Sequence, residues 1–249
     1  MLVRICCLLI SGLLITTTAR ADIHLESGEQ QQIMLELFTS EGCSSCPPAE
    51  KYLNEFYNHP KLWKPYIPLA FHVDYWDYLG WRDVYAKREY SERQRHYGRT
   101  LNVRTIYTPE FFVNGKEWRS GFYTRLPEIK TRIVGNLKVD IKGQSITAMF
   151  LPSQTTMNNT VLNIAVLGMD FRSQIKAGEN RGRDTTHQFV VLAHETVIGN
   201  NNTWKINLPA LQQNNISRPK AVVVWISEQG SPVPIQSLGG FVSGEKNPE

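Results

Sequence analysis

Cysteine is scarce in this chain, and no hydrophobic run is long enough to cross a membrane. The 249 residues contain only four cysteines, and the longest apolar run, residues 5–15, falls short of the about 20 residues that span a bilayer. The net charge of +4 is too small to indicate a dedicated nucleic-acid binder. With 41% hydrophobic and 20% charged residues, the composition is typical of a globular protein and excludes long disorder.

The first 21 residues have the pattern of a secretory signal peptide. Arg4 precedes the apolar run at 5–15, and residues 19–21 (ARA) form a small-x-small cleavage site. We expect cleavage after this site, which removes Cys6 and Cys7 and leaves no membrane span in the mature chain. The predicted location is therefore periplasmic or secreted.

The mature chain then contains a single pair of cysteines, Cys43 and Cys46, in a C-x-x-C motif. A disulfide that closes so small a ring stabilises a fold little, because the constraint on the unfolded chain is largest for long loops. Reactivity explains the spacing better: Cys43 attacks a partner disulfide, and Cys46 resolves the mixed disulfide. The alternative is an inert structural disulfide.

Strands and helices alternate through the first half of the mature chain. We expect a helix to begin near Cys43, because Pro47 and Pro48 suit a first helical turn and apolar residues follow at helical spacing. Asn114-Gly115 indicates a hairpin turn. The expected elements are a strand at 32–38, the helix from 43, a strand at 67–73, a helix at about 83–101, a hairpin at 108–119 and a closing helix over 126–135.

The second half has the pattern of an antiparallel β-sandwich. Short alternating segments are separated by clusters of Gly, Asn, Pro and Ser. The strand candidates are 137–141, 145–151, 160–167, 188–197, 203–208 and 220–226. We therefore predict two domains, at 22–136 and 137–249.

Four sequence segments resemble the DUF1223 family of bacterial secreted proteins. They are LELFTSEGCSSCPPA at 35–49, HVDYWDYLGW at 72–81, YTP at 107–109 and GENRGR at 178–183. The order of strand, C-x-x-C, helix and later Thr108-Pro109 also resembles the thioredoxin-like fold. The resemblance implies an α/β fold, with a thioredoxin-like domain followed by an antiparallel β-sandwich domain, in an exported setting.

In the thioredoxin-like fold that the chain resembles, a cis-proline faces the cysteine pair. This assigns a partner-binding groove to Thr108 and Pro109, where backbone groups would pair with an extended segment. The alternative is an ordinary trans proline that opens an edge strand.

His72 and Asp74 lie two positions apart at the end of the second expected strand, so their side chains share a face. They are candidates for a proton shuttle to the resolving cysteine, or for ligands that form a soft, mixed metal site with Cys43 and Cys46. The alternative is that they hold the aromatic insertion at 74–83 by hydrogen bonds.

Three further features have both a functional and a structural interpretation. The aromatic residues at 76, 78 and 81 either form a binding patch or anchor their loop. The basic residues between 87 and 99 are interrupted by acidic ones, which favours a solvated helix face. The segment 178–183 has the composition of a turn, with an anion site at its arginines as the alternative.

The sequence therefore predicts an exported thiol-disulfide oxidoreductase or redox partner. It would act on protein thiols and disulfides through Cys43 and Cys46, without a cofactor or a resident metal. Two alternatives remain: a copper or other soft-metal carrier that uses the same cysteines, and a non-catalytic binding module with a structural disulfide. No oligomeric state is assigned.

Overall fold

Strands make up most of the secondary structure of this protein. The computed structural model describes residues 22–102, 105–119, 125–128, 130, 132–154, 159–199, 201–211 and 221–242. Among them lie the α-helices α1 (Pro47–Asn54) and α2 (Arg88–Leu101) and the 3-10 helices η1 (Glu55–Asn58) and η2 (Asp77–Leu79). The strands are β1 (Ile23–Glu26), β2 (Ile33–Thr39), β3 (Tyr66–His72), β4 (Glu110–Val113), β5 (Lys116–Glu117), β6 (Gly135–Lys142), β7 (Ser145–Pro152), β8 (Thr160–Gly168), β9 (Phe171–Gln174), β10 (Asp184–His187), β11 (Val190–Ile198), β12 (Thr203–Asn207), β13 (Ala221–Glu228) and β14 (Pro234–Phe241).

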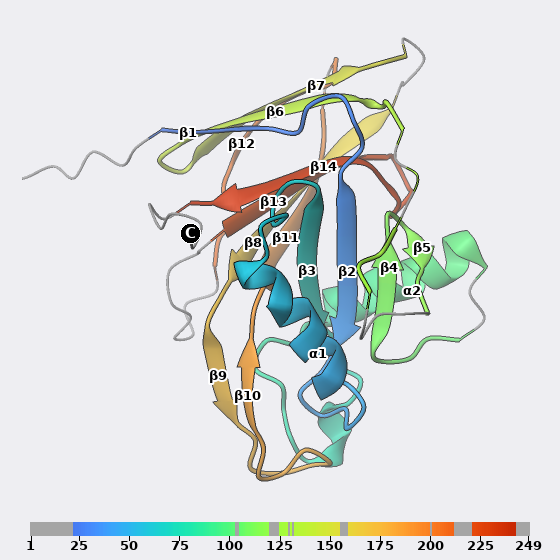
Figure 1. Cartoon of the computed structure of the whole chain (residues 1–249), viewed down its shortest axis with the longest axis vertical. Helices are drawn as coiled ribbons and strands as arrows, with labels where there is room; N and C mark the ends of the chain where they lie inside the picture. Colours follow the sequence, from blue (N-terminus) through green and yellow to red (C-terminus); the bar gives the residue numbers. More distant parts are fainter. Residues whose placement is uncertain are drawn as a thin grey trace, which may run out of the picture.

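One eight-stranded mixed sheet forms the centre of the molecule (Figure 1). Its strand order is β14-β13-β8-β11-β3-β2-β4-β5. β3 pairs in parallel with β2 and with β11, and the remaining neighbours are antiparallel. The central strands are buried along their whole length, because side chains on both sheet faces are covered.

Different layers cover the two halves of this sheet. Figure 1 shows α1 in front of the sheet and α2 behind it, at the end that contains β2, β3 and β4. At the other end, the antiparallel sheet β1-β6-β7-β12 packs on β8, β13 and β14 through a separate apolar cluster. The alternating burial of β6 and β7 is the pattern of a sheet with one face in the core.

The expected thioredoxin-like α/β class is wrong, because the described residues form a mainly β structure with two α-helices in mixed and antiparallel sheets. The closing helix expected over 126–135 is not found in its described residues. Ile133 instead forms a bridge with Gln30. The described residues around Ile133 are therefore extended rather than helical, because their backbone groups pair with the segment around Gln30.

The remaining strand expectations match the structure, with differences at the ends. All six candidates of the second half lie in strands, and the packing of β6, β7 and β12 on β8 and β13 is that of a β-sandwich. Asn114 and Gly115 form the hairpin turn with φ of 45° and 78°. β1, β9, β10 and β14 were not expected. These strands are short or contain glycine, and their local pattern is weak.

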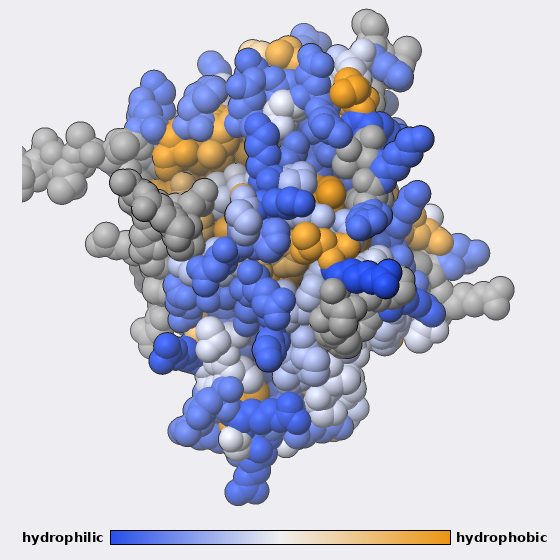
Figure 2. All heavy atoms as spheres, viewed as in Figure 1, coloured by the Kyte–Doolittle hydropathy of each residue, from blue (hydrophilic) through white to orange (hydrophobic). Residues whose placement is uncertain are grey.

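The boundary expected at residue 136 stays a prediction. Strands from both sides of it share the eight-stranded sheet, and β1 pairs with β6 across it. The signal peptide expected at 1–21 lies outside the described residues. No helix in the described part of the chain is long and apolar enough to span a membrane. The face shown in Figure 2 is mainly hydrophilic, with apolar groups limited to small areas.

Candidate functional site

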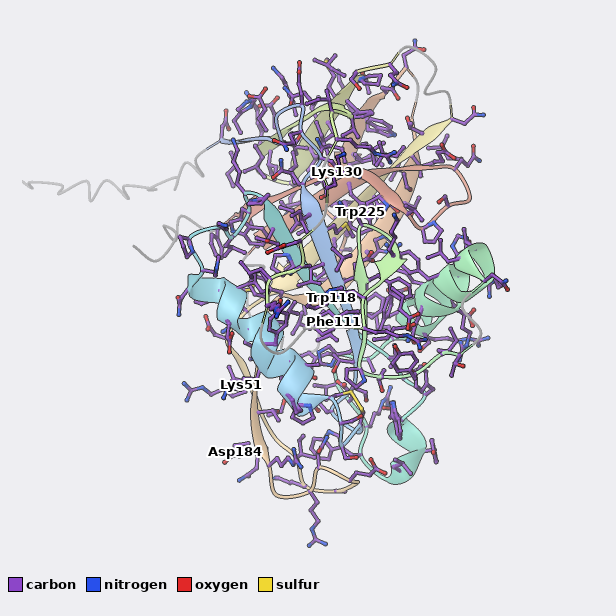
Figure 3. The ribbon with its side chains drawn as sticks, turned by 45° about the vertical axis from the view of Figure 1, so that its right-hand side comes forward. Lys51, Phe111, Trp118, Lys130, Asp184 and Trp225 are labelled. Carbon is purple, nitrogen blue, oxygen red and sulfur yellow. A yellow bond between two sulfur atoms is a disulfide. The ribbon has the colours of Figure 1, made fainter. Side chains whose placement is uncertain are left out.

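Cys43 and Cys46 form a disulfide immediately before α1 (Figure 3). Their Cα atoms lie 5.4 Å apart, and neither residue exposes any surface, at 0% each. Ser44 and Ser45 between them are exposed. A partner can therefore touch the turn that contains the disulfide, but it reaches the sulfur atoms only after the covering residues move.

The helix begins later than the sequence predicted. Cys46 is the N-cap of α1, and its carbonyl accepts the backbone N–H groups of Ala49 and Glu50. The backbone N–H of Cys46 bonds the carbonyl of Cys43 in a tight turn instead of a helical turn. Cys46 therefore lies at the N-terminus of the helix and Cys43 precedes it.

Ser45 connects the disulfide to Thr108. Its hydroxyl lies 3.3 Å from the Cys43 sulfur and donates to the Thr108 carbonyl at 3.3 Å. The Thr108–Pro109 bond is cis, as the resemblance implied. The structure thus brings together the two segments that the sequence assigned to one site.

Trp76 covers one side of the cysteine turn. Its backbone and Cβ lie so close to Gly42 that a Cβ at that position would approach the Trp76 Cβ to 3.0 Å. The Trp76 indole N–H donates to the Thr108 hydroxyl at 2.7 Å, and the Trp81 indole N–H donates to Glu41 at 2.7 Å. These two rings anchor their loop, whereas Tyr78 is 78% exposed.

The segment between β9 and β10 covers another side of the turn. The buried Asn180 amide donates to the carbonyls of Glu41 and Cys43, both at 2.8 Å. Glu179 accepts the backbone N–H of Ser44 at 3.2 Å. From the sequence this segment was interpreted as a turn, with an anion site at its arginines as the alternative, and the contacts of Asn180 and Glu179 with the cysteine turn were missed. Their distance of more than 130 positions from the cysteines leaves no local signal.

His72 and Asp74 are held by separate partners. The His72 Nδ1 lies 2.7 Å from an Asp83 oxygen, and Asp74 accepts the hydroxyl of Ser91 at 2.5 Å. Burial opposes the charged form of His72, but the Asp83 carboxylate and its hydrogen bond raise the pKa of His72 above its usual value. These contacts agree with the alternative that both residues fix the insertion at 74–83, and the proton-shuttle role stays a prediction.

A buried network of histidines and carboxylates lies beside the same helix. Glu50 of α1 contacts His187 of β10 (Oε2 to Nδ1, 2.7 Å), and the other ring nitrogen of His187 lies 3.0 Å from Glu41. Burial lowers the pKa of His187, but Glu50 and Glu41 together raise it to about 10. Burial raises the pKa of Glu50, but the charges of His187 and His72 and the hydrogen bonds of His187 and Thr39 together lower it below its usual value.

The basic face predicted for α2 is only partly solvated. Arg93 is buried, and its guanidinium donates to Glu36 of β2 at 2.6 Å and lies over the Trp225 ring of β13. Arg95 is half-exposed and pairs with Glu92 on the surface. Arg93 therefore connects a helix to strands from both halves of the chain.

A family model described as "Protein of unknown function (DUF1223)" matches residues 34–227. No curated protein matches the chain. Protein AGR_C_4864 from Agrobacterium tumefaciens is similar in structure, with a TM-score of 0.61 and 22% identity, over 87% of this chain and 96% of that one. HBP35 of Porphyromonas gingivalis has a TM-score of 0.57 and 15% identity, over 88% of this chain and 77% of that one. At these identities the two structures support the fold alone.

Proposed function

The chain belongs to the DUF1223 family, whose description defines no activity, and we propose from its own site that it is an exported thiol-disulfide oxidoreductase or redox partner. The observation that carries this proposal is the Cys43–Cys46 disulfide at the N-terminus of α1, beside the carbonyl of Thr108. A helix N-terminus favours a thiolate over a thiol, because the helix dipole stabilises negative charge. At α1 the dipole acts without free N–H groups, since Pro47 and Pro48 have none and those of Ala49 and Glu50 donate to the Cys46 carbonyl.

The reaction is an exchange of one disulfide for another. In the reduced protein, the Cys43 thiolate attacks a sulfur atom of a partner disulfide and releases a partner thiolate, which takes up a proton. The Cys46 thiolate then attacks the Cys43 sulfur, restores the internal disulfide and releases the second partner thiol. Two electrons pass from the cysteine pair to the partner, and the reverse sequence oxidises a partner dithiol.

Ser45 supports Cys43 as the attacking residue. A serine hydroxyl has one proton to donate, and in the disulfide form this proton points to the Thr108 carbonyl. After reduction, the Cys43 sulfur 3.3 Å away becomes a charged and stronger acceptor. The partner's backbone can then take the place of Ser45 at the Thr108 carbonyl.

A single-cysteine variant tests this proposal. Reduced Cys46→Ser protein should accumulate a mixed disulfide between Cys43 and glutathione when mixed with glutathione disulfide, because the resolving thiol is missing. Mass spectrometry detects the adduct, and Cys43→Ser is the matched control, which should form far less. In addition, iodoacetamide should modify Cys43 well below pH 8.5 and Cys46 slowly. Equal reactivity of both cysteines, typical of free thiols, would contradict the proposal.

A binding module with a structural disulfide is the second candidate, and the complete burial of both cysteines favours it. In that case neither single-cysteine variant forms an adduct readily while folded. The soft-metal alternative has less support. His72 is bonded to Asp83 through Nδ1, and the described ligand groups place His72 with Glu50 and His187 rather than with the cysteines.

A further inference from the structure

Three buried side chains from three elements meet beside α1. Glu50 comes from α1, His72 from the end of β3 and His187 from the end of β10. One potential ligand atom of each lies within 4.8 Å of the others. His72 and His187 are 1% and 2% exposed, and Glu50 is 7% exposed. We propose that Glu50, His72 and His187 bind a divalent transition-metal ion of the zinc type, separately from the cysteine pair.

The outer hydrogen bonds of the two histidines are those of metal ligands. A ligating histidine usually donates its second ring N–H to a carboxylate, which fixes the ring and its tautomer. His72 contacts Asp83 through Nδ1 at 2.7 Å, and His187 contacts Glu41 through Nε2 at 3.0 Å. Each histidine therefore has one nitrogen oriented by a carboxylate outside the proposed ligand set. The other nitrogen of His72 has no partner, and the other nitrogen of His187 faces Glu50.

The carboxylates that orient the histidines are themselves fixed. Asp83 accepts the backbone N–H groups of Glu41 and Tyr85, both at 2.9 Å. Glu41 accepts the indole N–H of Trp81 at 2.7 Å. Such support is what keeps a metal site in one geometry.

An unpartnered atom at the cluster is the second, independent observation. The Nε2 of His72 is buried and has no hydrogen-bond partner among the described residues. A buried polar atom without a partner is unfavourable, because it has lost its hydrogen bonds to water. A metal ion would bind the lone pair of the His72 Nε2. If the cluster instead held a proton on His187, that lone pair would still have no partner.

The remaining donor atoms complete a compact set. His187 Nδ1 and Glu50 Oε2 lie 2.7 Å apart, and the second oxygen of Glu50 accepts the Thr39 hydroxyl at 2.5 Å. The internal pocket that these three residues line has no room for a water molecule. A bare divalent ion is smaller than water and could enter. Three protein ligands are the number found in catalytic zinc sites, so a water as fourth ligand would require the pocket to widen.

The charge of the cluster also suits a divalent ion. Glu41, Glu50 and Asp83 supply three carboxylates to the two histidines. The negative charge of these carboxylates can be balanced to the same extent in two ways: by one extra proton on each histidine, or by one divalent ion. Binding would therefore exchange two protons for one ion without a change in buried charge. Nitrogen ligands with one carboxylate favour zinc over the harder magnesium and calcium ions.

The binding experiment uses purified protein without a polyhistidine tag. We expect demetallated protein to take up about one zinc ion per chain, measured by elemental analysis after gel filtration. Cobalt(II) should bind in its place and give the visible absorption of a low-coordinate site. Glu50→Gln, His72→Gln and His187→Gln should lose this uptake, and Asp83→Asn should weaken it about 10- to 100-fold through His72.

Two control variants distinguish the cluster from binding of zinc elsewhere on the protein. His194→Gln changes a half-buried histidine of β11 outside the cluster and should bind zinc normally. A Cys43→Ser, Cys46→Ser double variant should also bind normally and show no cobalt–thiolate band, whereas loss of binding would place the metal at the cysteines and overturn the proposal.

Each remaining result is also decisive. Zinc uptake well below one ion per chain by folded wild-type protein would show that the cluster holds protons only, and would overturn the proposal. If the ligand variants do not fold, wild-type protein still decides: perturbation of the His72 and His187 ring signals by zinc in NMR spectra supports the site, and unchanged signals contradict it.

Discussion

At the scale of single residues, Ser45 has the most direct influence on the chemistry of Cys43. Its hydroxyl lies 3.3 Å from both the Cys43 sulfur and the Thr108 carbonyl. Ser45→Ala should raise the pKa of reduced Cys43 by about one unit, because a hydrogen bond to a charged group is worth about 1.5–3 kcal/mol when buried and less at this exposed position. The pH dependence of alkylation in a Cys46→Ser background measures this change.

Ser44→Ala is the matched control for that measurement. Ser44 is also exposed and contacts Glu179 through its backbone N–H, which the substitution retains. The pKa of Cys43 should therefore be the same as in the parent. If Ser44→Ala and Ser45→Ala shift it equally, the hydroxyl of Ser45 has no special role.

Glu110, two residues after Thr108, should make the stability of the protein depend on pH. Burial raises the pKa of its carboxyl to about 7, against a hydrogen bond from Gln94 that lowers it. Between pH 4.5 and 7 the folded state thus binds a proton that the unfolded state has released. The free energy of unfolding should fall as pH rises through this range and level off above about 7.

Glu110→Gln should remove this part of the pH dependence, because the amide carbonyl still accepts from Gln94 and does not titrate. Urea unfolding measures the free energy of unfolding of both proteins at pH 5 and at pH 8. The difference in this free energy between wild type and variant should change by about 2 kcal/mol between the two pH values, after allowance for solvent screening. A difference that is constant with pH would show that Glu110 is ionised throughout.

At the scale of elements, local signals in the sequence located the cysteine turn well, and the resemblance correctly implied the cis peptide bond at Thr108–Pro109. Pro47 and Pro48 mark the first turn of α1, and Asn114-Gly115 marks the hairpin. The start of α1 was placed too early, since a turn of two serines has no pattern that separates it from a helix. Asn180 and His187 were missed as site residues because only the folded chain brings β9 and β10 to α1.

The segment between β9 and β10 should control access to the disulfide. Asn180→Ala removes two hydrogen bonds to the carbonyls of Glu41 and Cys43. At about 1 kcal/mol each, their loss should make opening of this cover about tenfold easier or more. The rate of disulfide reduction by dithiothreitol, followed by thiol release, should rise by a similar factor.

Arg181→Ala is the control for the same segment, since Arg181 is exposed next to Asn180. Its reduction rate should equal that of the wild type. An unchanged rate in Asn180→Ala would mean that Trp76, or another part of the structure, limits access to the sulfur atoms.

At the scale of the whole molecule, the sequence predicted the strands of the second half but not how the two halves join. β3 and β11 are more than 100 positions apart and pair in parallel at Ala70 and Val190. Nothing local in either strand specifies that neighbour, since β3 and the first four residues of β11 are apolar segments that could pair with any other buried strand. The α/β fold class that was assigned from the cysteine motif and its resemblance was therefore wrong for the chain. The order of a strand, the cysteine turn and a helix around the motif was predicted correctly.

The shared sheet and Arg93 lead us to expect that the two predicted domains unfold together. Arg93 of α2 bonds Glu36 of β2 and lies over Trp225 of β13, so α2 packs on strands from both sides of residue 136. If unfolding is one transition, a defect placed in one half lowers the protection of amides in both.

Leu37→Ala tests this expectation, because Leu37 of β2 is completely buried, and such a truncation costs about 2–5 kcal/mol. Native-state hydrogen exchange should show that the slowest amides of β2 and of β13 lose the same free energy of protection. Val84→Ala, at a site that is 69% exposed, should change neither. If β13 keeps its full protection while β2 loses it, the halves fold independently. The boundary near residue 136 would then be real, because the β3–β11 and β1–β6 pairings and the contacts of Arg93 would be too weak to couple two complete cores.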